Sequence, residues 1–365
     1  MKGSRVEILV TGGSGFLGRN IVETLLEDRP KWAISILDVK PPPASVSKRI
    51  SQFLQADLTS AESVNNAFVD YTPDIVVHVA GVIPARKLRY STKESDWLKV
   101  KAVNYDGTKN VLDAAMSSGC RCFLYTSSCT VTMDDLDHDY YLANEEVATG
   151  LVALHYGRSK CLAENYVMSS EHAEKGLLAC ALRPCTIIGP GDTAVIGVMH
   201  DLIAKRETSF IVGDGYNFCD FMYIDNAVHA HMLAIENLLT TATAAGHVLN
   251  ISNQQPVYFW DFLAFVWAQF GHFPAFRVHI PAIIAWLTGW LLEWITWLTG
   301  SVSTLDRGSV KDGIHTAYSS NEKAIRILGY EPKIDLAEGV RRSCEGYKRH
   351  LIAKVPASAS DTAIK

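Results

Sequence analysis

The chain has 365 residues, of which 48% are hydrophobic and 20% charged, and its formal net charge is −5. A chain this apolar can offset the entropy of ordering, which excludes disorder along its whole length, and its acidic balance excludes a general basic footprint for nucleic acid. Its eight cysteines form no Cys-x-x-Cys pair and no zinc-type spacing, which indicates buried thiols in a reducing compartment. Residues 1–5 lead directly into a strand-like run, so we expect no signal peptide.

Strand-like and helical patterns alternate through the first half of the chain. In chain order, the strand-like runs are 6–10, 33–37, 75–79, 122–125 and 178–182, and the helical patterns lie near 17–27, 60–69, 101–118 and 158–173. This alternation predicts an α/β protein with a Rossmann doubly wound parallel sheet.

Beyond about residue 186 the alternation stops, and turn sequences such as Gly189-Pro190-Gly191-Asp192 appear. We therefore expect a dinucleotide-binding Rossmann domain at 1–185 that also holds the catalytic residues. A smaller, interleaved substrate-binding region should follow at 186–350. The Ala/Ser-rich residues 351–365 are expected to form a flexible tail.

A glycine-rich turn follows the first strand-like run. Residues 11–18 read Thr-Gly-Gly-Ser-Gly-Phe-Leu-Gly, and a helical pattern begins within them. Gly12 permits a tight turn, Gly15 lets the backbone approach a pyrophosphate, and Gly18 allows the helix to pack closely on the strand. The helix N-terminus offers N–H groups and a partial positive charge to phosphates. We predict a dinucleotide site whose contacts in this turn are Gly12, Gly15, Phe16 and Leu17.

Asp38 ends the second strand-like run, 20 residues after Gly18. A carboxylate at this position accepts hydrogen bonds from the adenosine ribose and repels a 2′-phosphate, which favours NAD over NADP. Lys40 is near enough in sequence to weaken that preference, and the alternative for Asp38 is a solvated loop acid. Further cofactor contacts are expected after the third and fourth strands, at Asp57, Leu58, Ala80 and Gly81.

A Tyr-x-x-x-Lys pair, Tyr156 and Lys160, provides the candidate catalytic side chains. Residues at i and i+4 share a helix face, so the ammonium would lower the phenol's pKa from its ordinary value near 10 and make it a general base. Ser128 follows the fifth strand, at the sheet edge where open α/β proteins bind ligands, and its hydroxyl can hold a substrate oxygen. The alternative for Ser128 is a structural role as a cap at the end of the strand. Asn104 is a further candidate, and its alternative is a side-chain bond to the backbone of its own helix.

In this order, the motifs resemble those of the extended short-chain dehydrogenase/reductase family. The matching segments lie at 11–18, 57–58, 104–108, 125–128, 156–160, 182–184 and 189–190. The resemblance implies that Tyr156 is the acid/base, that Lys160 binds the nicotinamide ribose and lowers the tyrosine's pKa, and that Ser128 orients the substrate hydroxyl. Ser127 is the alternative serine. The segment after Pro184 would line the nicotinamide, so the implied cofactor contacts also include Tyr156, Lys160 and Pro184.

Within that family, the chain is similar to the 3β-hydroxysteroid dehydrogenase branch, and especially to fungal decarboxylating sterol-4α-carboxylate 3-dehydrogenases. The similar stretches lie at 210–215, 220–226, 250–253, 259–260, 279–281 and 328–332. This implies NAD-dependent oxidation of a 3β-hydroxyl on a sterol, steroid or triterpenoid ring, with loss of an adjacent C4 carboxyl as CO2. The alternatives are a terpenoid 3β-hydroxy dehydrogenase or ketoreductase without decarboxylation, and a nucleotide-sugar epimerase. A homodimer is a further implication.

Residues 280–300 contain one charged side chain, Glu293, and four of the chain's eight tryptophans. The tryptophans share one helical face, and about 20 apolar residues can just span a bilayer. Tryptophan clusters also suit the headgroup level of a membrane. The alternatives are contact with a membrane surface, a membrane span, and a core helix or hydrophobic lip over the substrate site. For a lipid-borne substrate we expect the cytosolic face of the endoplasmic reticulum or a lipid droplet, with a soluble cytoplasmic protein as the alternative.

Other charged clusters have weaker functional interpretations. A nucleotide-sugar enzyme would need cations for its diphosphate, for which the chain offers Arg86, Lys87 and Arg89. We interpret these three residues as part of a solvated loop. The acidic run from 134 to 146 could suggest cation binding, but it lacks the spacing of an EF-hand, so we interpret it as a solvated loop as well. His229 and His231 lie two residues apart, on different faces of a helix, so we expect no shared metal. The Tyr–Lys pair argues against a dinucleotide-sensing module without catalysis.

Overall fold

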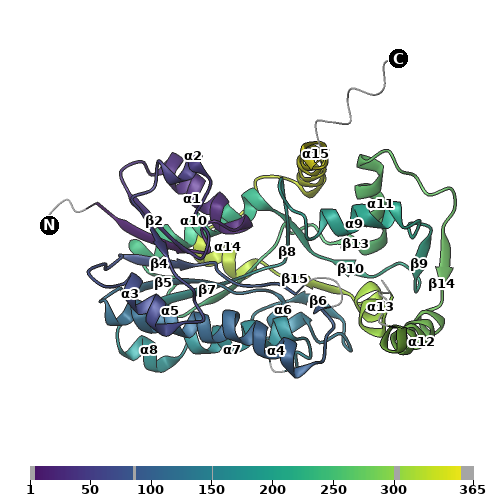
Figure 1. Cartoon of the computed structure of the whole chain (residues 1–365), viewed down its shortest axis with the longest axis horizontal. Coiled ribbons are helices and arrows are strands. Elements are labelled where there is room, and N and C mark those ends of the chain that lie inside the picture. The colour runs from purple at the N-terminus through teal and green to yellow at the C-terminus, as the bar shows by residue number, and fades with distance from the viewer. Residues whose placement is uncertain (1–4, 85–87, 150, 300–304, 355–365) are drawn as a thin grey trace, which may run out of the picture.

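The computed structural model describes residues 5–84, 88–149, 151–299 and 305–354 (Figure 1). Its centre is a seven-stranded parallel sheet in the order β12-β7-β5-β4-β1-β2-β3. Ligands of open α/β sheets bind where the strand order reverses, which here is between β1 and β4. The strands are β1 (Glu7–Thr11), β2 (Ala33–Asp38), β3 (Gln52–Gln55), β4 (Ile75–His78), β5 (Cys122–Thr126), β7 (Leu178–Pro184) and β12 (Val248–Ile251).

Helices cover both faces of this sheet (Figure 1). Ile8 and Val10 of β1 pack toward one helix layer and Leu9 toward the other, because successive strand side chains point to opposite faces. One layer is formed by α1 (Phe16–Asp28) and α10 (Ile224–Leu239), and the other by α3 (Ala61–Ala67), α5 (Gly107–Ser117) and α7 (His155–Val167). The predicted Rossmann doubly wound fold is confirmed.

Shorter helices connect these elements. They are α2 (Ala44–Ser47), α4 (Glu94–Lys101), the π-helix η2 (Ala102–Asp106), α6 (Thr130–Met133), α8 (Ser170–Glu174) and α14 (Glu322–Leu328). The helical pattern at 101–118 is thus divided between η2 and α5. The pattern at 158–173 is divided because the Ser169 side chain accepts a hydrogen bond from the Glu171 N–H and begins α8 as a new helix.

The second region lies beside the large sheet (Figure 1). Its strands are β6 (Tyr140–Ala143), β8 (Thr186–Ile188), β9 (Phe210–Val212), β10 (Phe218–Cys219), β11 (Phe221–Tyr223), β13 (Val257–Tyr258), β14 (Val278–Ile280) and β15 (Ala317–Ser319). Its helices are α9 (Ile196–Ala204), α11 (Phe259–Gln269), α12 (Ala282–Thr299), α13 (Arg307–Ile314) and α15 (Leu336–Lys354).

The two regions interleave, as the sequence predicts. β12 and α10 return to the large sheet from the second half of the chain, whereas β6 from the first half joins the four-stranded sheet β13-β10-β15-β6. At the C-terminus, α15 includes residues 351–354, where the tail was expected to begin. Residues 355–365 lie outside the described part of the chain.

Helix α12 packs through its small residues and exposes its large apolar ones. Ala285 and Gly289 are buried, and a Cβ on Gly289 would lie 2.9 Å from the carbonyl carbon of Asp306. The interpretation as a core helix is therefore wrong, because the face opposite Gly289 is exposed and no element among the described residues covers it. None of the described helices has the length and apolarity to cross a membrane. The exposed side chains are Ile283, Ile284, Leu287, Trp290, Leu291, Trp294, Ile295 and Leu298.

Candidate active site

The glycine-rich turn brings backbone segments too close together for side chains. Gly12 has a φ of +68°, and a Cβ there would come within 2.7 Å of the Ala80 Cα. A Cβ on Gly18 would lie 2.1 Å from the Gly12 carbonyl oxygen, so only glycine fits. Helix α1 begins at Phe16 with no side-chain cap from the described residues and no acid in its first turn. Its first N–H groups therefore suit an anion.

Asp38 lies at the carboxyl end of β2, beside this turn. One of its oxygens accepts a hydrogen bond from the Ser14 N–H and the other from the Lys40 N–H, each at 3.1 Å. A carboxylate oxygen can accept two bonds, so half-buried Asp38 retains capacity for ribose hydroxyls. After β3, Asp57 is exposed, whereas Leu58 is buried in the core next to α5.

Tyr156 and Ser128 lie next to each other just beyond the carboxyl end of β5, and Lys160 is anchored to the end of the same strand. Lys160 is buried, and its Nζ donates to the Thr126 carbonyl oxygen at 2.7 Å. The Ser128 side chain lies next to the Tyr156 phenol and lowers its pKa. The structure therefore brings the three sequence-predicted catalytic side chains into one group.

Burial dominates the protonation of this group. It raises the pKa of Tyr156, and the neighbouring Ser128 side chain lowers it. Burial also lowers the pKa of Lys160 to about 7, against the opposing effect of Glu164. The sequence instead predicts that Lys160 lowers the pKa of Tyr156. The structure differs from this prediction because the Lys160 ammonium donates to the Thr126 carbonyl oxygen and not to the phenol.

The segments flanking Ser128 define which serine faces the phenol. The Cys129 N–H donates to the Pro184 carbonyl oxygen at 3.1 Å, which places the end of β7 beside Ser128. Ser127 is also buried, but its hydroxyl has no hydrogen-bond partner among the described residues. Of the two candidate serines, Ser128 is therefore the one that engages Tyr156.

Asn104 connects the loop after β4 to the catalytic helix. Its Nδ2 donates to the Val82 carbonyl oxygen and to the Ser159 hydroxyl, both at 3.0 Å, and its Oδ1 accepts from the Val82 N–H at 2.8 Å. A Cβ on Gly81 would lie 3.2 Å from Asn104 Oδ1 and 3.6 Å from Lys160 Nζ. Gly81 thus leaves space beside the lysine, in a region marked by a π-helix turn, a feature common at functional sites.

His78 is a buried polar group of the site that sequence reasoning missed. Its Nδ1 lies 2.7 Å from the Thr11 hydroxyl and its Nε2 lies 2.9 Å from the Thr108 hydroxyl. Thr108 donates onward to the Asn104 carbonyl oxygen at 2.6 Å, so His78 Nε2–H donates to Thr108 and Nδ1 accepts from Thr11. Burial lowers the pKa of His78 to about 3 and keeps the ring neutral. The one signal in the sequence is a polar residue at the end of an apolar strand.

His231 has a similar structural role behind β5. Its Nε2 lies 2.9 Å from the Thr126 hydroxyl, and its Nδ1 lies 2.7 Å from the Ala227 carbonyl oxygen. His229 is 6.2 Å from the Tyr330 ring instead. The two histidines occupy different faces of α10, as predicted.

A buried ion pair anchors the catalytic helix to the sheet. Glu164 lies one turn after Lys160, and it pairs with Arg183 on β7, where both side chains are less than 5% exposed. Arg183 Nε donates to Glu164 Oε2 at 2.8 Å, and Nη2 makes a second bond to Oε1. This two-bond geometry is the strong form of an arginine–carboxylate pair. Sequence reasoning missed it, although Arg183 interrupts an apolar strand.

The interpretation as solvated loops is wrong for Arg89, Asp134 and Asp135, whereas Asp137, Asp139 and Glu146 of the acidic run are exposed. Arg89 Nη2 bonds Asp134 Oδ1 and Arg89 Nε bonds Asp312 Oδ2, each at 3.1 Å. Asp134 is 2% exposed, and Asp135 is also buried and accepts from His138 at 2.6 Å. These carboxylates are buried because cations and donors from distant segments neutralise them. Arg86 and Lys87 lie outside the described residues.

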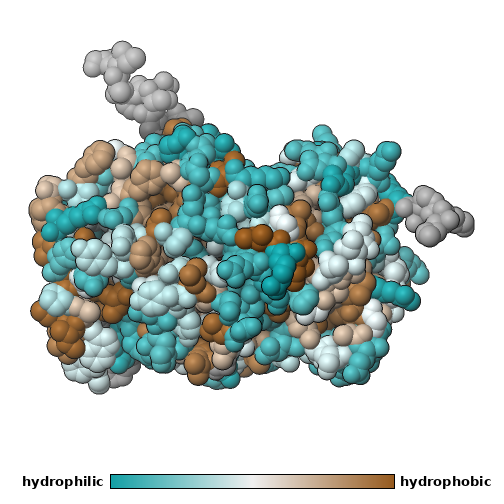
Figure 2. Space-filling model, turned by 180° about the vertical axis from the view of Figure 1, so that it is seen from behind, coloured by the Kyte–Doolittle hydropathy of each residue, from teal (hydrophilic) through white to brown (hydrophobic). Residues whose placement is uncertain are grey.

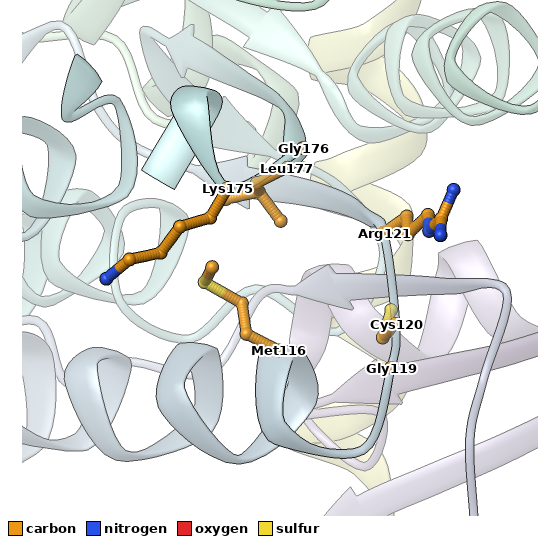
Figure 3. Close-up of a pocket in the computed structure, with 7 residues that line it drawn as sticks. All are labelled: Met116, Gly119, Cys120, Arg121, Lys175, Gly176 and Leu177. Atoms are coloured by element: carbon orange, nitrogen blue, oxygen red, sulfur yellow. The ribbon is translucent and has the colours of Figure 1, made fainter. Parts of the chain in front are cut away.

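A cavity of about 210 Å³ lies at the opposite edge of the sheet (Figure 3). It is lined by the turns that precede β5 and β7. Met116 and Leu177 face into it, whereas the Lys175 and Arg121 side chains point away from each other (Figure 3). Because no polar groups converge there, this cavity is not a candidate active site.

A doubly wound sheet, a glycine turn before α1 and a Ser–Tyr–Lys group at the end of β5 are the features of short-chain dehydrogenases/reductases. The model of the 3-beta hydroxysteroid dehydrogenase/isomerase family matches residues 9–282. The chain is 32% identical to the decarboxylating sterol-4-alpha-carboxylate 3-dehydrogenase of Schizosaccharomyces pombe, covering 91% of this chain and 94% of the relative. It is 30% identical to the Saccharomyces cerevisiae enzyme of that name, covering 92% and 96%. The chain belongs to the 3-beta hydroxysteroid dehydrogenase/isomerase family.

Solved structures similar to this fold include nucleotide-sugar enzymes. The Thermus thermophilus UDP-glucose 4-epimerase complex with NAD has a TM-score of 0.70 at 22% identity, covering 93% of this chain and 98% of that one. The Thermotoga maritima UDP-glucose 4-epimerase with UDP-glucose has a TM-score of 0.69 at 22% identity, covering 94% and 99%. At this level of identity, the similarity concerns the fold alone.

Proposed function

We propose that the protein oxidises the 3β-hydroxyl of a 4α-carboxysterol, or of a related triterpenoid ring, to the ketone, and that the C4 carboxyl is then lost as CO2. The observation that carries the proposal is the meeting of Tyr156, Ser128 and Lys160 at the end of β5. Similarity over nine-tenths of the chain to enzymes named for this reaction supports the choice of substrate.

The residues around the glycine turn fit a dinucleotide. Gly12 and Gly18 let the backbone of this turn pack closely on Ala80 and on itself, and the uncapped start of α1 suits a pyrophosphate. Asp38 would hold the adenosine ribose. When bound, NAD supplies the nicotinamide ring that accepts the hydride. The remaining proposed contacts are Gly15, Phe16, Leu17, Asp57, Leu58, Ala80, Gly81, Tyr156, Lys160 and Pro184.

Tyr156 takes the proton of the substrate hydroxyl as the hydride leaves C3, and Ser128 hydrogen-bonds the same oxygen. Lys160, whose Nζ donates to the Thr126 carbonyl oxygen, would hold the nicotinamide ribose. The product is a β-keto acid when C4 carries a carboxyl. The C4–carboxyl bond then breaks, its electron pair forms the C3–C4 double bond, the C3 oxygen takes up the carboxyl proton to give the enol, and CO2 leaves.

The test is NADH formation by the purified full chain with three substrates. These are a 4α-carboxy-3β-hydroxysterol, the same sterol without the carboxyl, and UDP-glucose. We expect NADH and CO2 in equal amounts from the first. Oxidation of the second sterol alone would leave a simple 3β-alcohol dehydrogenase. Activity on UDP-glucose alone would overturn the steroid assignment.

We infer NAD, not NADP, from Asp38, and expect kcat/KM with NAD to exceed that with NADP by about tenfold or more. A 2′-phosphate next to this carboxylate is repelled, and Asp38→Ser should shift the NAD/NADP ratio by about tenfold toward NADP. The ratio is the readout because loss of the bonds to Ser14 and Lys40 affects both cofactors. Asp28→Ser, an exposed acid at the far end of α1, is the matched control. An unchanged ratio in Asp38→Ser would exclude this role.

We also propose that α12 rests on a lipid surface at the cytosolic face of the endoplasmic reticulum or on a lipid droplet. Its exposed face carries apolar side chains, and the helix's one charge, Glu293, is engaged by Arg307 Nη2 at 2.8 Å. Figure 2 shows apolar side chains gathered at the end of the molecule that carries α12. Phe273 and Phe276, just before β14, are also exposed. A neutral apolar face of this kind binds lipid through burial and not through charge.

Replacing Leu287 and Leu291 together by glutamate should abolish cosedimentation with phosphatidylcholine vesicles. Both side chains are about half exposed, and burying each in lipid is worth roughly 1.5–3 kcal/mol at most. The variant should raise KM for vesicle-borne sterol and leave the Kd for NAD unchanged. Val69→Glu, at an exposed apolar residue in the turn after α3, is the control. Equal losses of sterol turnover and NAD binding would indicate a helix needed only for folding.

A further inference from the structure

Arg89 joins three elements that lie far apart in the sequence. It follows β4, and its guanidinium pairs with Asp134 after α6 and with Asp312 on α13, each at 3.1 Å. The Tyr90 hydroxyl donates to the same Asp312 oxygen at 2.6 Å. Arg89 is half-buried and Asp134 almost completely buried, so solvent and salt screen this network only weakly.

Asp134 in turn supports the first turn of the catalytic helix. Its Oδ2 accepts a hydrogen bond from the N–H of Gly157, the residue directly after Tyr156, at 3.2 Å. An acid at a helix N-terminus satisfies an N–H that has no partner within the helix and complements the helix dipole. A Cβ on Gly157 would lie 2.8 Å from the Asp134 carboxylate and 2.5 Å from the Thr130 carbonyl oxygen. The position of Asp134 therefore sets the position of the backbone that carries the phenol.

On its other side, the network holds α13 and, through it, α12. A Cβ on Gly308 would come within 2.6 Å of the Tyr90 ring, so the ring lies directly on the backbone of α13. At the start of α13, the Arg307 N–H donates to Glu293 Oε1 at 2.8 Å, and its guanidinium binds the same carboxylate. The one charge between residues 280 and 300 is thus used to fasten α12 to α13.

We propose that Arg89 is a positioning residue for the oxidation, which fixes Tyr156 relative to the apolar helix α12 by holding Asp134 and Asp312 together. The proposal rests on the proposed function in that Tyr156 is taken as the base. Its physical basis is a continuous set of contacts from α12 through Glu293, Arg307 and α13 to Asp312, Arg89, Asp134 and Gly157. Displacements of about 1 Å between substrate and catalytic group are enough to reduce a rate about 100-fold.

The charges of the network also act on the phenol. Burial raises the pKa of Tyr156 most and Asp134 raises it further, whereas Ser128 and Arg89 lower it. The other titratable groups near the phenol are Tyr125 and Cys129, whose own pKa values burial raises, so both are neutral. Removing the Arg89 charge while Asp134 remains ionised therefore raises the pKa of Tyr156 further. Keeping the charge but losing the two-armed geometry, as in Arg89→Lys, should displace the helix without this electrostatic change.

The first test is steady-state kinetics of Arg89→Gln and Arg89→Lys with the 4α-carboxysterol. We expect kcat to fall roughly 10- to 100-fold in both, with the Kd for NAD changed less than about twofold. The acid limb of the kcat–pH profile should move to higher pH in Arg89→Gln and stay in place in Arg89→Lys. Arg49→Gln, an exposed arginine with a 4.0 Å ion pair to Glu27, is the control. Unchanged kcat and pH profile in Arg89→Gln would overturn the proposal.

The second test is hydrogen exchange, which needs no substrate. In Arg89→Gln, amide exchange should accelerate about tenfold or more in the first turn of α7 and in α13 together. Asp312→Asn, which leaves the Arg89–Asp134 pair in place, should accelerate α13 more than α7, and covers the case in which Arg89→Gln does not fold. If the wild-type protein oxidises no sterol but the variants show these changes in exchange, the proposed function is rejected and the network is retained. Sterol oxidation with unchanged exchange in Arg89→Gln would reject the network alone.

Discussion

Tyr156→Phe should reduce kcat for the 4α-carboxysterol by roughly 10²–10⁴-fold, which is the range that a positioned general base contributes. The substitution removes the phenol oxygen of Tyr156, which lies next to Ser128, and retains the half-buried ring. The free energy of unfolding and the Kd for NAD should therefore change little. The measurements are kcat and KM for the sterol, NAD binding by fluorescence, and urea unfolding of both proteins.

The same helix provides a matched control for this experiment. Tyr166 lies ten residues further along α7, and its hydroxyl donates to Asp113 Oδ1 at 2.6 Å, away from Ser128. Tyr166→Phe should keep wild-type kcat. If Tyr156→Phe retained more than about a tenth of wild-type kcat, the phenol would not be the proton acceptor. The reduction in kcat would then be smaller than a general base usually contributes. Another group at the end of β5 would have to be sought.

Local spacing explains why much of the fold and the centre of the site were predictable. Gly12 lies in the turn before α1 and Gly18 in the first turn of that helix, and Tyr156 and Lys160 lie in one helix, so each pair is brought together by a few residues of backbone. Strands buried on both faces are also apolar runs that can be recognised without knowing their partners. For Ser128, its place at the end of a strand was sufficient, because parallel strands end at a common edge.

The features that were missed depend on partners far away in the chain. Arg89 and Asp312 are 223 residues apart, and a charge without a known partner is correctly expected to be in solvent. The same applies to Glu164, which is buried only because Arg183 meets it from β7. For α12, the apolar face was evident, but whether it pointed inward depended on which face α13 covers. That was decided by Gly289, whose missing side chain admits the Asp306 backbone.

Arg183→Met should lower the free energy of unfolding by about 3–5 kcal/mol, because it removes one partner of a buried ion pair and leaves the other charge without compensation. Both side chains are less than 5% exposed, so water cannot replace the lost cation. The measurement is urea unfolding, compared through the midpoint and slope. Lys175→Met removes the cation of an exposed pair with Glu171 and should leave stability unchanged within error.

The double variant Arg183→Met with Glu164→Leu separates the ion pair from the packing around it. If uncompensated charge is the cause, removing both charges should restore much of the stability that Arg183→Met loses. If the double variant is no better than the single one, the fit of the two-armed guanidinium between α7 and β7 is what matters. If Arg183→Met lowered the free energy of unfolding by less than about 1 kcal/mol, the ion pair would contribute little to stability. The attachment of the catalytic helix would then rest on its apolar contacts, through Ala163 and Val167.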